Sequence, residues 1–417
     1  MFDALRKRIN GTFKNQELDS IFNNCFFNTI DTTLTKDDNG YFIITGDIPA
    51  MWLRDSVMQV FHYLPFADDK DVKELIEGVI RKQFQLITID SYANAFMHDE
   101  NQHSQWEGKV ETDHLPKIVW ERKYELDSLC YPFFLSYKLF EFTKDISIFD
   151  KSFINAFDVM IETIQKERNH SQKSSYYFIR PPKEDVGRNT NPKEEKGLVW
   201  SGFRPSDDAC EFHYHIPDNM FLVGVLSKLS KVFVLFKDET RKAICNQLVT
   251  ELSPLINQYG IVEIPNIGKI YVSETNCLGG YNTNDDANVP SLLSIPFLEY
   301  PFFDKDVYEN TRRFILSKNN KYYYEGNILK GIGSPHTPSN RVWPLSLSMQ
   351  GLTSDDEKEI IDCLKQLIVS TNNKKLMHES VDCNDVSVYS RPWFAWANSQ
   401  FCLFVLKHKD LINKSYL

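Results

Sequence analysis

Apolar residues three and four positions apart recur along nearly the whole chain, and this spacing restricts it to a mainly helical fold. In residues 71–89, for example, Val72, Leu75, Ile76 and Val79 fall on one face of a helix. Comparable helices are predicted at 2–14, 18–32, 55–66, 125–143, 153–164, 217–234, 238–257, 287–298, 305–317, 340–351, 360–368 and 391–407. About a dozen helical segments in sequence predict helix hairpins. No repeat of fixed period is readable, which disfavours a solenoid and leaves open a closed ring of hairpins.

Strand signals are sparse in comparison. Residues 41–44 predict one short strand, and 261–264 facing 270–272 predict a hairpin. Two polar stretches without apolar period, 97–118 and 168–198, are predicted to be long loops, and loops of this length are often functional. The strands are therefore expected to decorate a helical body.

Composition narrows the class of partner. Apolar residues make up 42% of the 417 positions, enough for a large core, and no linker composition interrupts residues 1–417, so a single domain is predicted. The chain carries 47 basic and 57 acidic residues, a net charge of −10, without a basic face. Nucleic acid and anionic membrane surfaces are therefore excluded as expected partners, because a polyanion would be repelled.

Cysteine usage and hydropathy bear on the compartment. Eight cysteines are scattered without a C-x-x-C pair or a framework spacing, which is typical of reduced thiols rather than of disulfides or a zinc cluster. No apolar leader and no spanning segment is readable. The sequence predicts a cytoplasmic protein, and we expect a monomer.

The stretch 199–210 has the composition of a binding turn. Asp207 and Asp208 follow aromatic residues and a glycine- and proline-interrupted bend, just before a predicted helix. One interpretation is that Ser206 or an aspartate merely caps that helix. Trp200 and Arg204 favour a sugar site instead, because aromatic rings stack on the C–H faces of sugars while charged groups bind hydroxyls.

A second aromatic and charged stretch covers residues 46–56. Here Arg54 and Asp55 are placed to grip two neighbouring hydroxyls of one sugar, with Trp52 beneath it. The alternative is that Asp55 caps the next helix and pairs with Arg54. A third stretch, 120–128, shares this aromatic and charged composition, but its dense charge is also interpreted as a solvated helix start.

Further bent, polar stretches occur at 282–291 and 331–338. Glu379 follows a histidine and precedes an aromatic loop at 391–399, so that a closed fold would bring it towards Asp207. A carboxylic acid and a carboxylate that face each other are what glycosidic cleavage requires: one protonates the leaving oxygen, and the other attacks the anomeric carbon or activates water.

A metal site is the competing interpretation. His213 and His215 would suit one strand, and Asp285 with Asp286 could hold a hard cation. The sequence lacks H-E-x-x-H and EF-hand spacings, and it also lacks the glycine-rich loops that bind dinucleotides or phosphates. No metal and no cofactor is therefore expected.

Four stretches, 45–56, 200–210, 285–291 and 333–338, closely resemble glycoside hydrolase family 125, in the same order, within a likeness that runs from about residue 18 to about 405. The resemblance implies an all-α (α/α)6 barrel, a six-hairpin toroid with minor β-hairpin decorations. It also implies a metal-independent, inverting exo-α-1,6-mannosidase that removes non-reducing terminal mannose from oligomannosides such as N-glycan fragments.

Carried over by position, the resemblance makes Asp207 the general acid and Glu379 the general base. We expect a raised pKa to keep Asp207 protonated near neutral pH, owing to its aromatic surroundings and the charge of Asp208. The chain departs from the family pattern after Glu379, where residues 380–384 replace an expected glycine and aromatic. The expected substrate-binding residues are Trp52, Arg54, Asp55, Arg204, Asp208, Asp286 and His336.

Two alternatives remain on the same barrel. A carbohydrate-binding protein would have kept the fold and lost turnover. A glycoside phosphorylase would need phosphate, which a hydrolase does not.

Overall fold

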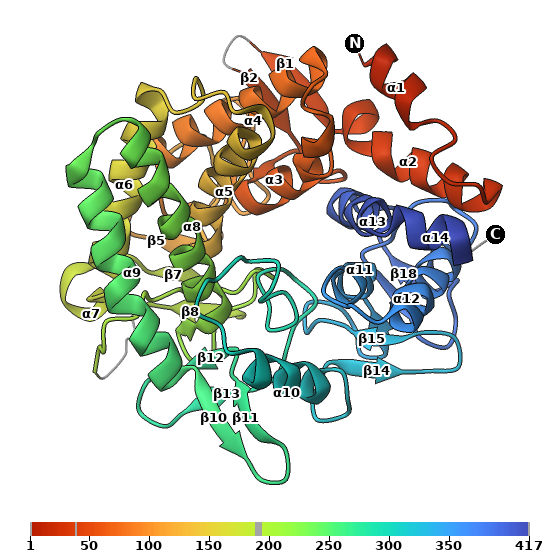
Figure 1. Ribbon diagram of the computed structural model, residues 1–417. Coiled ribbons are helices and arrows are strands. Elements are labelled where there is room, and N and C mark those ends of the chain that lie inside the picture. The colour runs from red at the N-terminus through yellow and green to blue at the C-terminus, as the bar shows by residue number, and fades with distance from the viewer. Residues whose placement is uncertain (1, 38–39, 188–193, 416–417) are drawn as a thin grey trace.

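The computed structural model describes residues 2–37, 40–187 and 194–415. Its helices form two concentric rings, viewed along the axis in Figure 1. The inner ring contains α3 (Leu53–Phe61), α5 (Leu126–Thr143), α8 (Ile216–Leu235), α11 (Pro344–Leu352) and α13 (Ala395–Lys407). The outer ring contains α2 (Gln16–Thr32), α4 (Lys70–Ile89), α6 (Lys151–Glu167), α9 (Glu239–Tyr259), α10 (Lys305–Ile315) and α12 (Glu357–Ser370). Shorter helices are α1 (Asp3–Ile9), η1 (Leu64–Phe66), α7 (His170–Lys173) and α14 (Lys409–Ser415).

The two rings follow from the burial of the helices. Inner helices are buried along most of their length, and every residue of α3 is buried. The outer helix α4 is amphipathic, with Val72, Leu75, Ile76 and Val79 buried on the predicted face. It begins after Asp69, whose side chain accepts hydrogen bonds from the first-turn backbone.

The predicted helix at 287–298 is wrong, since this segment is a series of turns. It packs closely against α8 at Gly224. A Cβ added to this glycine would lie only 2.7 Å from the carbonyl oxygen of Leu298. Phe297 contacts Phe61 and Phe134 of the inner ring. The segment thus takes the place of an inner helix between α8 and α11, and prolines 290 and 296 explain why it is not helical.

The ring closes where the two ends of the chain meet (Figure 1). Helix α13 packs on both α2 and α3. Near the termini, Lys14 donates its backbone N–H to Asn413 (2.9 Å), and Asn413 donates to the carbonyl of Thr12 (3.1 Å). Within the described ranges, every helix is too short or too polar to cross a lipid bilayer.

Both predicted strand regions are confirmed. Strand β1 (Leu34–Asp37) pairs with β2 (Gly40–Ile43), and β10 (Ile261–Ile264) pairs with β11 (Gly268–Tyr271), both antiparallel. The sequence did not reveal the other strands, which are very short. They are β3 (Met51–Trp52), β4 (Ala95–Phe96), β5 (Glu111–Thr112), β6 (Val119–Glu121), β7 (Phe178–Arg180), β8 (Glu184–Val186), β9 (Tyr214–His215), β12 (Glu274–Thr275), β13 (Tyr281–Asn282), β14 (Tyr323–Glu325), β15 (Lys330–Ile332), β16 (Arg341–Val342), β17 (Ser380–Asp382) and β18 (Tyr389–Ser390).

The short sheets hold the loops that surround the barrel opening. The stretch 97–118 is mostly loop, as predicted, and 168–198 holds α7, β7 and β8 between loops, with residues 188–193 outside the described part. Strand β3 of the three-stranded sheet β3-β4-β6 leads directly into α3. Strand β17 of the sheet β16-β17-β18 begins directly after residue 379. These two sheets therefore anchor two of the predicted site stretches.

Candidate active site

One pocket collects most of the residues singled out in the sequence. The start of α3 contributes Trp52, Arg54 and Asp55, and distant loops contribute Asp207 and Glu379. The other lining residues are Thr45, Ile48, Pro205, Ser206, Asn288, His336, Trp343, Arg391, Phe394 and Trp396. Three predicted residues lie outside this lining, Arg204, Asp208 and Asp286; the first and last line a small adjacent cavity.

The turn that carries Asp207 is closed by a bridge between Phe203 and Ala209. Inside it the Arg204 N–H donates to the Asp208 carbonyl, and the Asp207 N–H donates to the Arg204 carbonyl (2.9 and 2.8 Å). Asp207 has φ 64°, the left-handed region that costs a non-glycine residue about 1 kcal/mol or more. Helix α8 has no side-chain cap, so the capping interpretation of this stretch is wrong.

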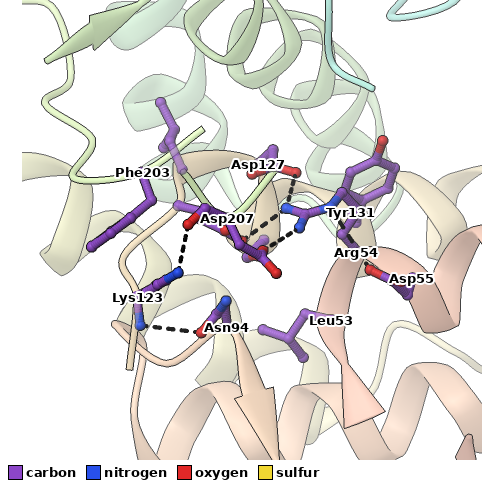
Figure 2. Close-up of polar contacts among 12 residues, drawn as sticks. Leu53, Arg54, Asp55, Asn94, Lys123, Asp127, Tyr131, Phe203 and Asp207 are labelled. Carbon is purple, nitrogen blue, oxygen red and sulfur yellow. Dashed lines mark hydrogen bonds and ion pairs between the residues drawn. The ribbon is translucent and has the colours of Figure 1, made fainter. Parts of the chain in front are cut away.

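Arg54 is the centre of a buried carboxylate cluster (Figure 2). Its Nη2 donates to Oδ1 of Asp207 over 2.8 Å. Its Nη1 donates to Oε2 of Glu125 over 2.8 Å and to Oδ2 of Asp127 over 3.1 Å. The side chain is only 2% exposed, and Asp55 lies 3.8 Å from its Nε. Arg54 therefore fixes the carboxyl group of Asp207 at the wall of the pocket.

Charged residues in the stretch 120–128 complete this cluster, and their interpretation as a solvated helix start is wrong. Lys123, Glu125 and Asp127 are all buried. Lys123 donates from Nζ to the carbonyl oxygen of Asp207 (2.5 Å) and lies over the Phe203 ring. These residues are buried because an inner helix begins here. The only sequence signal was dense charge directly before a long apolar helix.

The pKa values of the cluster reverse one expectation. Burial would raise the pKa of Asp207, but the Arg54 charge, a hydrogen bond with Glu125 and the Lys123 charge together hold it below its usual range. The predicted raised pKa of Asp207 is therefore wrong, because the sequence did not show that a guanidinium contacts it. Burial raises the pKa of Glu125 well above its usual range, and burial raises that of Asp55 to about 6.

A second polar group stands beside Asp207. His336 Nδ1 lies 3.8 Å from Oδ2 of Asp208, and Arg204 lies 3.9 Å from the same oxygen. Burial would lower the pKa of His336, but the Asp208 carboxylate outweighs it and raises the pKa to about 9. Arg204 also approaches Glu274 (3.5 Å). The raised pKa favours the protonated form of His336 at neutral pH, and this residue lines the same pocket as Arg54.

Asp286 ties two of the bent stretches together. Its Oδ1 accepts from the backbone and side chain of Asn288, and Ser334 donates to its Oδ2 over 3.2 Å. The Ala287 N–H donates to the Gly333 carbonyl over 3.1 Å. Asp286 therefore holds the loop before His336.

The histidines and aspartate of the metal interpretation have structural partners. His213 contacts the Ser201 carbonyl at 3.0 Å and stacks on Trp200. His215 pairs with Asp218 at 2.9 Å. Both Asp285 oxygens accept backbone N–H groups of Leu292 and Leu293. In the described part of the chain, no three His, Cys, Asp or Glu side chains are grouped so as to hold a metal ion.

Glu379 faces the pocket from just before β17 and is 7% exposed. Arg391 Nε lies 3.6 Å from its Oε1 and 3.5 Å from Oδ2 of Asp47. Arg391 was not predicted as a site residue, although it lay in a stretch that the sequence singled out. The unusual residues after Glu379 form strand β17, and Tyr389 of the neighbouring β18 stacks on the preceding His378.

Comparisons with known proteins show which sequences this chain is similar to. The sequence profile of a family described as metal-independent α-mannosidases (GH125) matches residues 15–406. The meiotically up-regulated gene 157 protein of Schizosaccharomyces pombe is 38% identical over 429 aligned residues, which cover 96% of this chain and 83% of the yeast protein.

Solved structures extend the likeness to the fold. A metal-independent α-mannosidase of Streptococcus pneumoniae, described as a non-productive substrate complex with α-1,6-mannobiose, is 39% identical with a TM-score of 0.93, over 98% of this chain and 97% of its own. A bacterial glucoamylase complexed with acarbose has a TM-score of 0.64 at 13% identity, over 99% of this chain and 60% of its own, and supports the fold alone. The predicted all-α (α/α)6 barrel is confirmed.

Proposed function

Because the chain belongs to the metal-independent α-mannosidases of glycoside hydrolase family 125, we propose that it hydrolyses non-reducing terminal α-1,6-linked mannose with inversion. The linkage is supported by the pneumococcal relative, whose complex contains α-1,6-mannobiose. The proposed substrates are oligomannosides such as N-glycan fragments. The eight cysteines are all unbonded and buried, which supports a cytoplasmic setting.

The observation that carries the proposal is that Asp207 and Glu379, 172 positions apart in the chain, line one pocket. In the proposed reaction Asp207 protonates the glycosidic oxygen as the C–O bond breaks. Glu379 removes a proton from a water molecule that attacks the anomeric carbon from the opposite face. Inversion requires the two carboxyl groups to stand roughly 6.5–9.5 Å apart, leaving room for that water.

The other pocket residues have proposed roles in holding the terminal mannose. Trp52 offers an aromatic wall, and Asp55 offers a carboxyl group for hydroxyls. His336 carries positive charge towards both acids, since Asp207 and Glu379 each act to raise its pKa. Arg204, Asp208 and Asp286, which lie outside the lining of this pocket, are proposed to support it.

Mannose release from α-1,2-, α-1,3- and α-1,6-mannobiose tests the proposal, with purified protein in phosphate-free buffer containing a chelator. We expect release from the α-1,6-linked disaccharide only, detected by chromatography. Cleavage that appears only after phosphate is added would instead indicate a phosphorylase. Binding of mannobiose without cleavage under either condition would indicate a carbohydrate-binding protein.

A further inference from the structure

We propose that Glu125 is a positioning residue that stores the proton which Asp207 delivers to the leaving oxygen. This inference rests on the proposed function, because it assigns Glu125 a part in the same reaction. It is carried by the hydrogen bonds that join both carboxyl groups to Arg54 and by the balance of charge around that guanidinium.

One carboxyl oxygen of Glu125 is buried without a donor among the described residues. Its Oε2 accepts from Arg54 (2.8 Å) and from the hydroxyl of Ser128 (3.0 Å). Its Oε1 is buried and receives no hydrogen bond from an N–H or O–H group in the described ranges. Asp207 accepts from Nη2 of the same guanidinium, so the two carboxyl groups lie side by side on Arg54. Two neighbouring carboxyl groups can bond to each other only if one of them is protonated.

The charge balance points the same way. Arg54 contacts Glu125, Asp127 and Asp207 directly and lies near Asp55. Four ionised carboxylates around one buried guanidinium would leave several negative charges without compensation, so the cluster retains protons at neutral pH. The charged and titratable groups that interact with the Glu125–Asp207 pair are Arg54, Asp55, Lys123, Asp127, Arg180, Cys210 and His336.

The proton resides on Glu125 rather than on Asp207 when the pocket is empty. Arg54 and Lys123 favour the ionised form of Asp207, whereas the Glu125 side chain is fully excluded from solvent. The Asp207 side chain, in contrast, is 23% exposed and lines the pocket. Asp207 therefore touches the substrate, and Glu125 acts through it.

In the proposed step the proton of Glu125 passes to the ionised Asp207, and Asp207 gives that same proton to the glycosidic oxygen as the C–O bond breaks. Glu379 takes a proton from the attacking water. One turnover thus leaves Glu125 ionised and Glu379 protonated, and exchange with solvent through the pocket restores both. Because Glu125 must be protonated for the reaction, kcat/KM falls at alkaline pH with the apparent pKa of the Glu125–Asp207 pair and not with that of Asp207 alone.

The pH profile of Glu125→Gln on α-1,6-mannobiose tests this role. The glutamine amide has the shape of the glutamate side chain and can donate to Asp207, but it cannot release a proton. The alkaline limb then depends only on the lowered pKa of Asp207. We expect the alkaline limb of kcat/KM to move down by about one pH unit or more, with about a tenfold loss above it. Ser128→Ala, which removes a donor to Oε2, should move the limb upward because it disfavours ionised Glu125. A limb that stays in place in both variants would overturn the proposal.

Leaving-group dependence separates proton storage from a structural role. A dinitrophenyl α-mannoside needs no proton on its leaving oxygen, so Glu125→Gln should cleave it at nearly the wild-type rate. A purely structural role would lower kcat/KM for both substrates equally and at every pH.

An infrared measurement keeps the test independent of turnover. At pH 8 the wild type should show the carbonyl band of a buried protonated carboxyl group that is absent from Glu125→Gln and present in Asp127→Asn. If the wild type cleaves no mannoside, the proposed function fails while this band still reports the proton. If cleavage occurs and the band persists in Glu125→Gln, the proton-storage role fails alone.

Discussion

Arg54 donates from Nη2 to Oδ1 of Asp207 over 2.8 Å, so the residue proposed to act as the acid is held in a buried ion pair. The same guanidinium holds Glu125 and Asp127. This geometry orients the Asp207 carboxyl group at the pocket, but it also favours the ionised form. The proton of Asp207 must therefore come from the neighbouring carboxyl groups. The cluster around Arg54 thus contributes to the chemistry as well as to stability.

Arg54→Met should destabilise the protein strongly, because it leaves several buried carboxyl groups without their cation. We expect the free energy of unfolding to fall by about 3–5 kcal/mol at pH 7, measured by urea denaturation. Arg8→Ala is the control: its pair with Asp68 is exposed, and its loss should cost about 1 kcal/mol or less. A loss for Arg54→Met no larger than that of the control would contradict the central place given to Arg54.

Asp207→Asn and Glu379→Gln should separate chemistry from folding. Both changes keep the size of the side chain and remove its proton transfer, so kcat on α-1,6-mannobiose should fall by about 10²–10⁴-fold. The melting temperature should change little, because the pocket walls remain. Steady-state kinetics and calorimetry on the same preparations check both points. A variant that retains activity would remove that residue from its proposed role.

His336 should link stability to pH. Its pKa is raised to about 9 in the folded protein, above the ordinary value of 6.5, so the folded state favours the protonated form. The stabilisation relative to His336→Gln should be complete below about pH 6.5 and should disappear as the pH rises through 9. Urea denaturation across this range measures the difference. In an Asp208→Asn background the pH dependence of the same difference should be much weaker, and persistence of the full pH dependence there would rule out Asp208 as its main cause.

Local patterns predicted most of the barrel, and the exceptions have identifiable causes. Helix α4 was predicted almost to its ends, because residues close together in the sequence determine both its buried face and its cap. The segment 287–298 has apolar residues at helical spacing, yet its prolines and its contacts with α8 and the inner ring make it a series of turns. Apolar spacing alone does not distinguish these cases.

The site shows a similar division. Arg54, Asp207 and Glu379 lie in or near stretches with aromatic and charged residues, and the sequence pointed to all three. It did not reveal that Arg54 faces Glu125, because this contact joins residues 71 positions apart and depends on how the ring closes. Burial of Glu125 is a property of the assembled barrel, and the raised pKa follows from that burial.

Proton NMR of the first mannose released from α-1,6-mannobiose tests the central claim most directly. In phosphate-free buffer with a chelator, the account predicts that β-mannose appears first and then mutarotates, because water attacks opposite the leaving group. Early α-mannose would contradict the inverting roles of Asp207 and Glu379.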